Sequence, residues 1–174
     1  MSEPVRHDAT TIKLAERRIF SASFKPLYNE GMGLVEQTAE YLDGDGRAAA
    51  KSLSRIAATL YAAESMRLTT RLMQIASWLL LQRAANSGEM TRDQVAAEKA
   101  KVRLDTASVQ DNVPGWEELP AAFKSLVERS LSLQGLVRRM DAEIYGNGAL
   151  AAAPVRVNPV SDQITLLATA FGRA

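Results

Sequence analysis

The sequence contains no cysteine and a single histidine, His7, among its 174 residues. The absence of thiols excludes disulfides, thiolate zinc sites, iron–sulfur ligation and cysteine nucleophiles. A single imidazole leaves a serine triad without a plausible base and excludes metal sites built from several histidines. We therefore expect no enzyme activity, no catalytic residue, no metal site and no bound cofactor.

A charge imbalance and a long apolar run are also missing. Lys and Arg number 21 against 20 Asp and Glu, so the net charge of +1 gives no general reason to expect nucleic acid or an anionic membrane as a partner. The longest apolar run, Ile75–Leu81, is interrupted by Ser77 and is far shorter than the ~20 residues that span a bilayer. Residues 1–20 are rich in charge and lack the apolar core of a secretion signal. We expect a cytoplasmic protein.

Residues that favour helices dominate the composition. The chain has 28 Ala and 20 Leu, whereas Val and Ile together number 17. Ala and Leu have high helix propensity, and β-branched residues favour strands. The composition therefore predicts an all-α protein.

Apolar residues at spacings of three and four predict three long helices. These cover residues 23–42, with Ser23 as N-cap; residues 47–86, starting at Arg47 or Ser52; and residues 120–145. Thr91 and Gln94 form a capping-box pair that predicts a short extra helix to about Leu104. We predict a three-helix bundle over residues 21–146, after a flexible lead-in over residues 1–20, with a linker at 105–116.

The first and second helices carry apolar stripes that predict how they pack. Gly31 lies on the stripe of the first helix, which suggests a close helix crossing at this glycine. On the second helix the main stripe is Tyr61, Ser65, Leu68, Leu72, Ile75 and Leu79. A second set, Ala62, Met66, Thr69, Met73, Ala76 and Leu80, is expected to widen this stripe and place the helix centrally.

Another face of the second helix combines basic, amide and apolar side chains. Its members are Arg67, Arg71, Gln74, Trp78 and Leu81. Trp and Arg are enriched at binding hot spots, so this face is a candidate partner surface or self-complementary dimer interface. The alternative is that the first or third long helix covers Trp78 while Glu36 or Glu40 neutralises the arginines.

The C-terminal residues 147–174 are predicted to form a flexible tail. Gly, Asn, Ala and Pro dominate residues 146–160, and a short apolar helical face follows, formed by Ile164, Leu167 and Phe171. Apolar motifs on flexible tethers commonly dock onto partner proteins, so these three residues are candidate docking residues. The alternative is a terminal turn that folds back onto the bundle.

Several segments resemble the RcdA family (regulator of CtrA degradation) of alphaproteobacteria. They are Leu27–Met32, Tyr41–Gly44, Ala76–Leu80 and above all Glu64–Gln74, which reads ESMRLTTRLMQ. The resemblance covers roughly residues 20–105 with high specificity and the rest more loosely.

The resemblance implies a non-enzymatic protease adaptor. Family members are similar three-helix bundles that form homodimers and carry a mobile C-terminal tail. They help the ClpXP protease, primed by the response regulator CpdR, to receive cell-cycle cargo such as CtrA. Delivery of CtrA also involves the cyclic-di-GMP effector PopA, and these proteins concentrate at a cell pole.

Two other classes of function remain as alternatives. A helical regulator that binds nucleic acid would require a basic recognition face, and the arginine pairs of this chain lack interleaved aromatic residues. A bundle that binds a small ligand would require a cavity with convergent polar groups, for which Ser65, Thr69 and Ser130 are the candidates.

Overall fold

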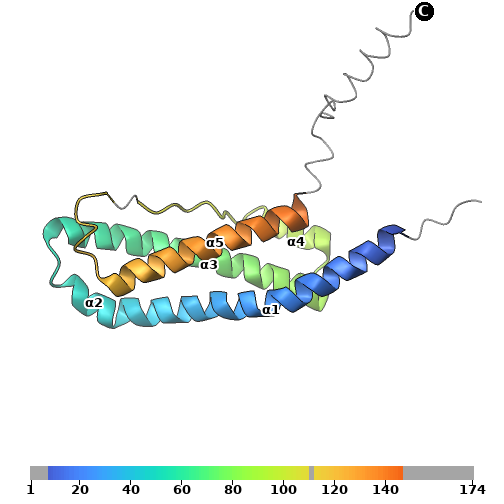
Figure 1. Cartoon of the computed structure of the whole chain (residues 1–174), viewed down its shortest axis with the longest axis horizontal. Helices are drawn as coiled ribbons and strands as arrows, with labels where there is room; N and C mark the ends of the chain where they lie inside the picture. The colour runs from blue at the N-terminus through green and yellow to red at the C-terminus, as the bar shows by residue number, and fades with distance from the viewer. Residues whose placement is uncertain (1–7, 110–111, 147–174) are drawn as a thin grey trace, which may run out of the picture. The chain divides into compact units, whose positions relative to one another are not determined.

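The computed structural model describes residues 8–109 and 112–146, and side chains from Phe24 onward (Figure 1). The helices are α1 (Asp8–Asp43), α2 (Asp45–Ala50), α3 (Arg55–Ser87), α4 (Arg92–Lys99) and α5 (Ala121–Tyr145). The described residues contain no strand, which confirms the predicted all-α class. The chain divides into two units, residues 1–139 and 140–174, and the packing described below belongs to the first unit.

The three long helices α1, α3 and α5 pack around a shared apolar core. Figure 1 shows α3 returning alongside α1 in the opposite direction, and these two helices are in contact. Phe123 of α5 contacts both other long helices. The centroid of its ring lies 6.4 Å from the ring centroid of Tyr41 on α1 and 4.6 Å from that of Tyr61 on α3. The predicted three-helix bundle with a short extra helix is therefore confirmed.

The first helix is longer than the sequence predicts. It begins at Asp8, so the predicted start at Ser23 is wrong, and Pro26 lies inside the helix. Residues 8–25 contain neither glycine nor proline, so nothing in their backbone preferences stops the helix before Pro26. Pro26 removes one backbone donor and its ring crowds the carbonyl of residue 22, but buried Phe24 and Leu27 hold both sides of it in the core.

The chain between α1 and α3 forms a separate short helix. The predicted second helix is interrupted at residues 51–54, so α2 and α3 are distinct elements. Ser54 caps α3 by accepting a hydrogen bond from the Ala57 amide, and its hydroxyl donates to Glu118 Oε1 at 2.9 Å. At the other end Gly88 stops α3 as predicted, in the left-handed conformation with φ of 81°.

Residues 102–109, which we call the 102–109 segment, run as irregular extended chain after α4. The Thr91–Gln94 capping box of α4 is present as predicted, but α4 ends at Lys99 rather than near Leu104. Along the segment, half-buried residues at 102, 104, 106 and 108 alternate with exposed residues at 103, 105 and 107. This two-residue period means that one side of the extended chain packs on the bundle. Part of the predicted linker is therefore a packed element.

Gly31 marks a close crossing of α1 over the other two helices. A Cβ at this position would collide with Cδ1 of Leu79 on α3 and would lie 3.7 Å from Cδ2 of Leu133 on α5. Both leucines are buried, so neither side chain has free space to move into. The crossing inferred from the sequence is confirmed. Gly33, on the same helix, has no atom within 4 Å of its hypothetical Cβ.

We predict that Gly31→Ala is less stable than Gly33→Ala by about 1–3 kcal/mol, the usual range for overpacking a buried site. Both changes gain the same ~1 kcal/mol of helix propensity, so their difference isolates the steric conflict with Leu79. Urea unfolding followed by far-ultraviolet circular dichroism gives both free energies. Equal stability of the two variants would contradict a tight crossing at Gly31.

Candidate protein-interaction site on α3

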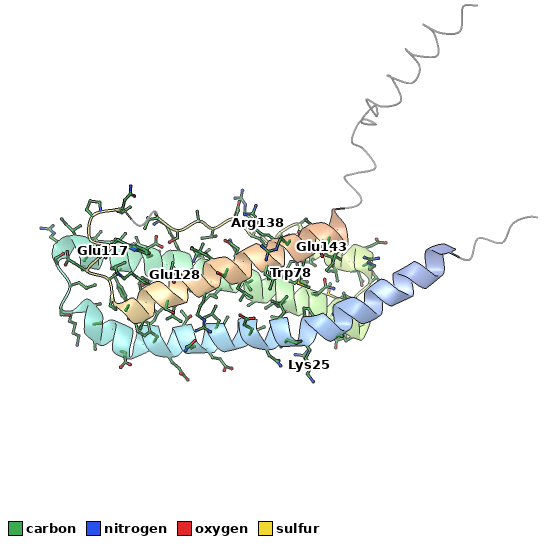
Figure 2. The ribbon with its side chains drawn as sticks, viewed as in Figure 1. Lys25, Trp78, Glu117, Glu128, Arg138 and Glu143 are labelled. Carbon is green, nitrogen blue, oxygen red and sulfur yellow. The ribbon has the colours of Figure 1, made fainter. Side chains whose placement is uncertain are left out.

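The mixed face of α3 is mostly covered within the chain. Trp78 and Arg71 are buried, Gln74 and Leu81 are half-buried, and only Arg67 is exposed. Figure 2 shows Trp78 among the helices, whereas Lys25 points away from α1. The sequence left open whether this face is a partner surface or is covered by other parts of the chain. In the single chain Arg71 and Trp78 are covered.

The covering elements are α5 and the 102–109 segment, and Arg71 bonds to both. Its Nε donates to the carbonyl oxygen of Thr106 at 3.1 Å, and its Nη1 donates to Ser130 Oγ of α5 at 2.7 Å. Burial lowers the pKa of Arg71, and the negative charge of Glu64 opposes this shift. The alternative that named Glu36 or Glu40 as the partner of the arginines differs from the structure, in which Glu64 makes the ion pair with Arg67.

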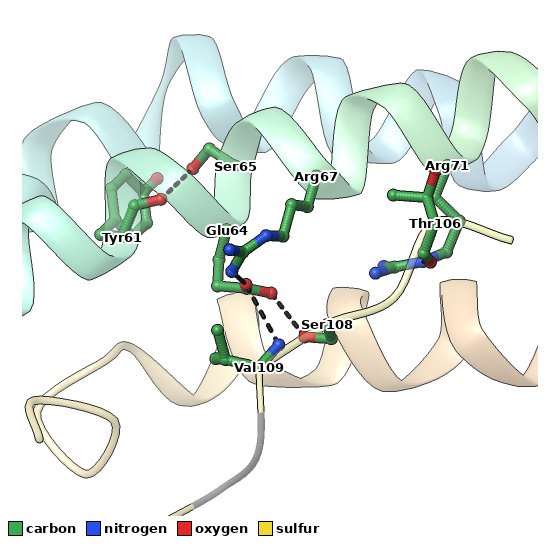
Figure 3. A network of polar contacts seen from close by, with 8 residues as sticks. All are labelled: Tyr61, Glu64, Ser65, Arg67, Arg71, Thr106, Ser108 and Val109. Carbon is green, nitrogen blue, oxygen red and sulfur yellow. Dashed lines mark hydrogen bonds and ion pairs between the residues drawn. The ribbon is translucent and has the colours of Figure 1, made fainter. Parts of the chain in front are cut away.

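Glu64 holds the end of the 102–109 segment against α3 (Figure 3). Its carboxylate is buried and accepts hydrogen bonds from Ser108 Oγ at 2.5 Å and from the Val109 amide at 3.3 Å. It also pairs with Arg67, three residues further along α3. A buried carboxylate needs such partners, so α3 and the segment depend on each other here.

Thr106 is the second point of attachment. Its hydroxyl donates to Gln74 Oε1 at 2.9 Å, and its carbonyl oxygen accepts from Gln134 Nε2 of α5 at 3.3 Å in addition to Arg71. The segment is thus tied to two helices by side chains from both. The sequence did signal this packing, through the alternation of Val102, Leu104, Thr106 and Ser108 with more polar or smaller residues.

The hydroxyls proposed for a ligand cavity do not converge. Ser65 Oγ donates to the Tyr61 carbonyl, Thr69 Oγ1 to the Ser65 carbonyl and Ser130 Oγ to the Val127 carbonyl, each within its own helix. The described residues also hold no group of three or more His, Cys, Asp or Glu that could bind a metal ion. None of the helices described is long and apolar enough to cross a membrane.

A second face of α3 is exposed although it is apolar. We call it the methionine face, and it consists of Ala62, Met66, Thr69, Met73, Ala76 and Leu80, of which Ala76 is half-buried and the other five are exposed. Met66, Met73 and Leu80 are 73%, 66% and 50% exposed. The expectation that this set widens the core stripe is wrong, because α1, α5 and the 102–109 segment already occupy the other sides of α3. Contiguous exposed apolar surface of this kind marks interaction sites.

The polar groups around the methionine face are already satisfied. Thr59, Thr69, Thr70 and Ser77 are exposed, and each hydroxyl donates to the carbonyl four residues earlier in α3, at 2.8–2.9 Å. Between residues 59 and 80 the one exposed charged side chain is that of Arg67. A partner could therefore cover this face without stripping water from charges or unpaired hydroxyls.

The candidate docking residues of the tail, Ile164, Leu167 and Phe171, lie outside the described residues, as does His7.

Comparison with known proteins identifies two similarities. The family described as "Protein of unknown function (DUF1465)" matches residues 15–171. The crystal structure of RcdA from Caulobacter crescentus CB15 is similar to this chain at 46% sequence identity and a TM-score of 0.57, covering 70% of this chain and 91% of that one. No curated protein matches the chain.

We predict that Arg71→Met destabilises the fold by about 1–3 kcal/mol, because two hydrogen bonds from a charged donor are lost. Hydrogen exchange should rise in residues 102–109 more than in α1. The matched control is Arg67→Met, which removes an arginine that is 43% exposed. Its effect should be smaller than that of Arg71→Met, because Glu64 keeps the hydrogen bonds from Ser108 and the Val109 amide. Unchanged exchange of the segment in Arg71→Met would show that Arg71 does not hold it.

Proposed function

Because this chain belongs to the RcdA family, we propose that it is a non-enzymatic adaptor in regulated proteolysis. The observation that carries this proposal is the 46% identity with RcdA over 91% of that chain. An adaptor acts by contact, since binding cargo and protease together raises the local concentration of cargo at the protease.

The specific system that we propose is delivery to ClpXP primed by CpdR. In this proposal the cargo includes CtrA, a PopA-like cyclic-di-GMP effector takes part, and the protein works in the cytoplasm at a cell pole. A chain in this role needs several separate surfaces. The methionine face of α3 and the apolar tail residues Ile164, Leu167 and Phe171 are our candidates for two of them.

The methionine face also supports a homodimer. Met66, Met73 and Leu80 recur every seven residues, and the small residues Ala62, Thr69 and Ala76 lie between them at the same spacing. This is the a and d pattern of a two-helix seam, with large side chains at one position and small ones at the other. A second copy of α3 is the partner that this alternation fits best.

Antiparallel pairing about a two-fold axis level with residue 71 places a large residue opposite a small one in every layer. Met66 then faces Ala76 of the second copy, Met73 faces Thr69 and Leu80 faces Ala62. Parallel pairing in register would place methionine against methionine and alanine against alanine. Interdigitation of large with small residues gives closer packing, which favours the antiparallel arrangement.

This proposal changes the roles of the residues first singled out for an interface. Arg67 stays a candidate contact residue, because it is exposed beside Met66. Arg71, Gln74, Trp78 and Leu81 act from within the chain in our proposal, by fixing the covered side of α3.

The adaptor proposal predicts that the chain accelerates degradation of CtrA by ClpXP, CpdR and PopA with cyclic-di-GMP. Deleting residues 161–174 should leave the thermal unfolding midpoint of the bundle unchanged and strongly reduce this acceleration, because the apolar docking residues are lost. The matched control replaces Ala151, Ala152 and Ala153 by serine, which alters the tail without touching Ile164, Leu167 or Phe171. If the intact chain has no effect on degradation the adaptor proposal fails, whereas full delivery by the shortened chain refutes only the role of the tail.

The dimer proposal predicts that Met73→Glu converts a dimer into a monomer in sedimentation, because it buries a charge in the seam. Leu136→Glu is the control, since it places the same charge at an exposed leucine of α5.

The native chain has no cysteine, so engineered cysteine pairs report the register of the two helices directly. Met66→Cys mixed with Ala76→Cys should form a disulfide readily, whereas Met66→Cys alone should not, because antiparallel pairing separates the two copies of residue 66 by about 15 Å. If the wild-type chain sediments as a monomer, the dimer proposal is refuted.

A further inference from the structure

A groove lies between the first half of α3 and a wall to which Val109, Val113 and Pro114 contribute. Its volume is about 540 Å³. Ile56, Leu60 and Ala63 of α3 line one side, Val113 lines the other, and Arg55 and Arg67 stand at its two ends along the helix. The groove adjoins the methionine face, because Thr59 borders both surfaces. Its apolar residues Ile56, Leu60 and Ala63 nevertheless point from α3 at a different angle from Met66 and Met73.

The floor of the groove is apolar and accessible. Ile56 is 62% exposed, although it is a large β-branched residue that gains most from burial. Thr59, which also lines the groove, has its hydroxyl bonded to the Arg55 carbonyl at 2.9 Å. An occupant would therefore be held at the floor by apolar contact and not by hydrogen bonds to side chains.

The charges of the described lining are both positive. Arg55 makes no ion pair within the part of the chain that the structure describes. Arg67 pairs with Glu64, but its side chain is 43% exposed. Glu64 also accepts from Ser108 and the Val109 amide, so it keeps two donors if Arg67 turns to an incoming carboxylate. Both guanidinium groups are thus available to an anionic partner, and arginine matches a carboxylate with two parallel hydrogen bonds.

The distance between the two arginines limits what can bind. Residues 55 and 67 are twelve positions apart in one helix, which corresponds to about 18 Å. An extended peptide covers that length in about five or six residues, with alternate side chains pointing to the same side. We propose that the groove binds an extended acidic segment of a partner protein, with carboxylates about six residues apart on one side of the peptide and apolar side chains between them.

This inference rests on the proposed adaptor function, because it supplies the chemistry of a partner segment. Its test needs no protease, so the two proposals can fail separately. The full-length chain is used to select from a phage-displayed library of random peptides, and the most enriched peptide is then labelled for fluorescence anisotropy. We expect selected peptides to carry acidic residues on both sides of apolar ones.

Charge reversal at each end of the groove then tests whether the enriched peptide binds in the groove. Arg55→Glu and Arg67→Glu should each weaken binding of the enriched peptide on the order of ten-fold, because attraction is replaced by repulsion. Arg92→Glu is the matched control, since Arg92 is an exposed arginine at the start of α4. This variant should bind the enriched peptide with the affinity of wild type. Circular dichroism checks that all variants remain helical.

Four results would overturn the inference. The first is selection of basic or uncharged peptides, and the second is equal binding by both groove variants and wild type. The third is a change of sedimentation in Arg55→Glu, which would identify a second copy of the chain as the occupant. The fourth is tighter peptide binding after deletion of residues 161–174, which would identify the chain's own tail as the occupant.

Discussion

The attachment of the 102–109 segment to α3 is the constraint on which the surfaces of this protein depend. Arg71 and Glu64 are both buried on α3, and neither could remain there without partners from the segment. Arg71 also reaches Ser130 on α5, so a single guanidinium joins a helix, an extended chain and a second helix. Buried polar groups of this kind favour one arrangement of the chain more than they add to its stability. If the segment lay elsewhere, the charges of Arg71 and Glu64 would be buried without their partners.

This attachment divides α3 into sides with different roles. One side packs on α1 and α5 through Leu68, Leu72, Ile75 and Leu79. A second side is closed by the 102–109 segment, and the methionine face remains exposed. A helix with apolar residues around most of its circumference would usually be buried on every side. Here the bundle has too few described elements to bury the last side, which is why an apolar surface is left for a partner.

Periodicity predicts the helices and the core stripes because each depends on local preference and on which residues share a face. Leu68, Leu72 and Phe123 are buried as their spacing indicates, and Gly31 marks the crossing that its position suggests. Periodicity alone cannot say which element covers a face. Arg71 and Trp78 look like surface and are buried, whereas Met66 and Met73 look like core and are exposed. Which sides of α3 are covered depends on the path of residues 102–109, and this path is set by contacts between residues distant in sequence.

The same attachment also shapes the groove beside α3. Val109 is the last residue before Gln110 and Asp111, and its amide is held by Glu64, so the chain leaves α3 at a fixed point before Val113 and Pro114 form the far wall. Further on, Gly115 has φ of 90°, and a Cβ there would lie 3.0 Å from Cα of Ala57, so the wall is pressed against the first turn of α3. The groove is thus bounded by two anchored points, and Arg67 connects it to the polar cluster through Glu64. A carboxylate that draws Arg67 away would leave Glu64 with its bonds to the segment alone, which links occupancy of the groove to the contacts that form its wall.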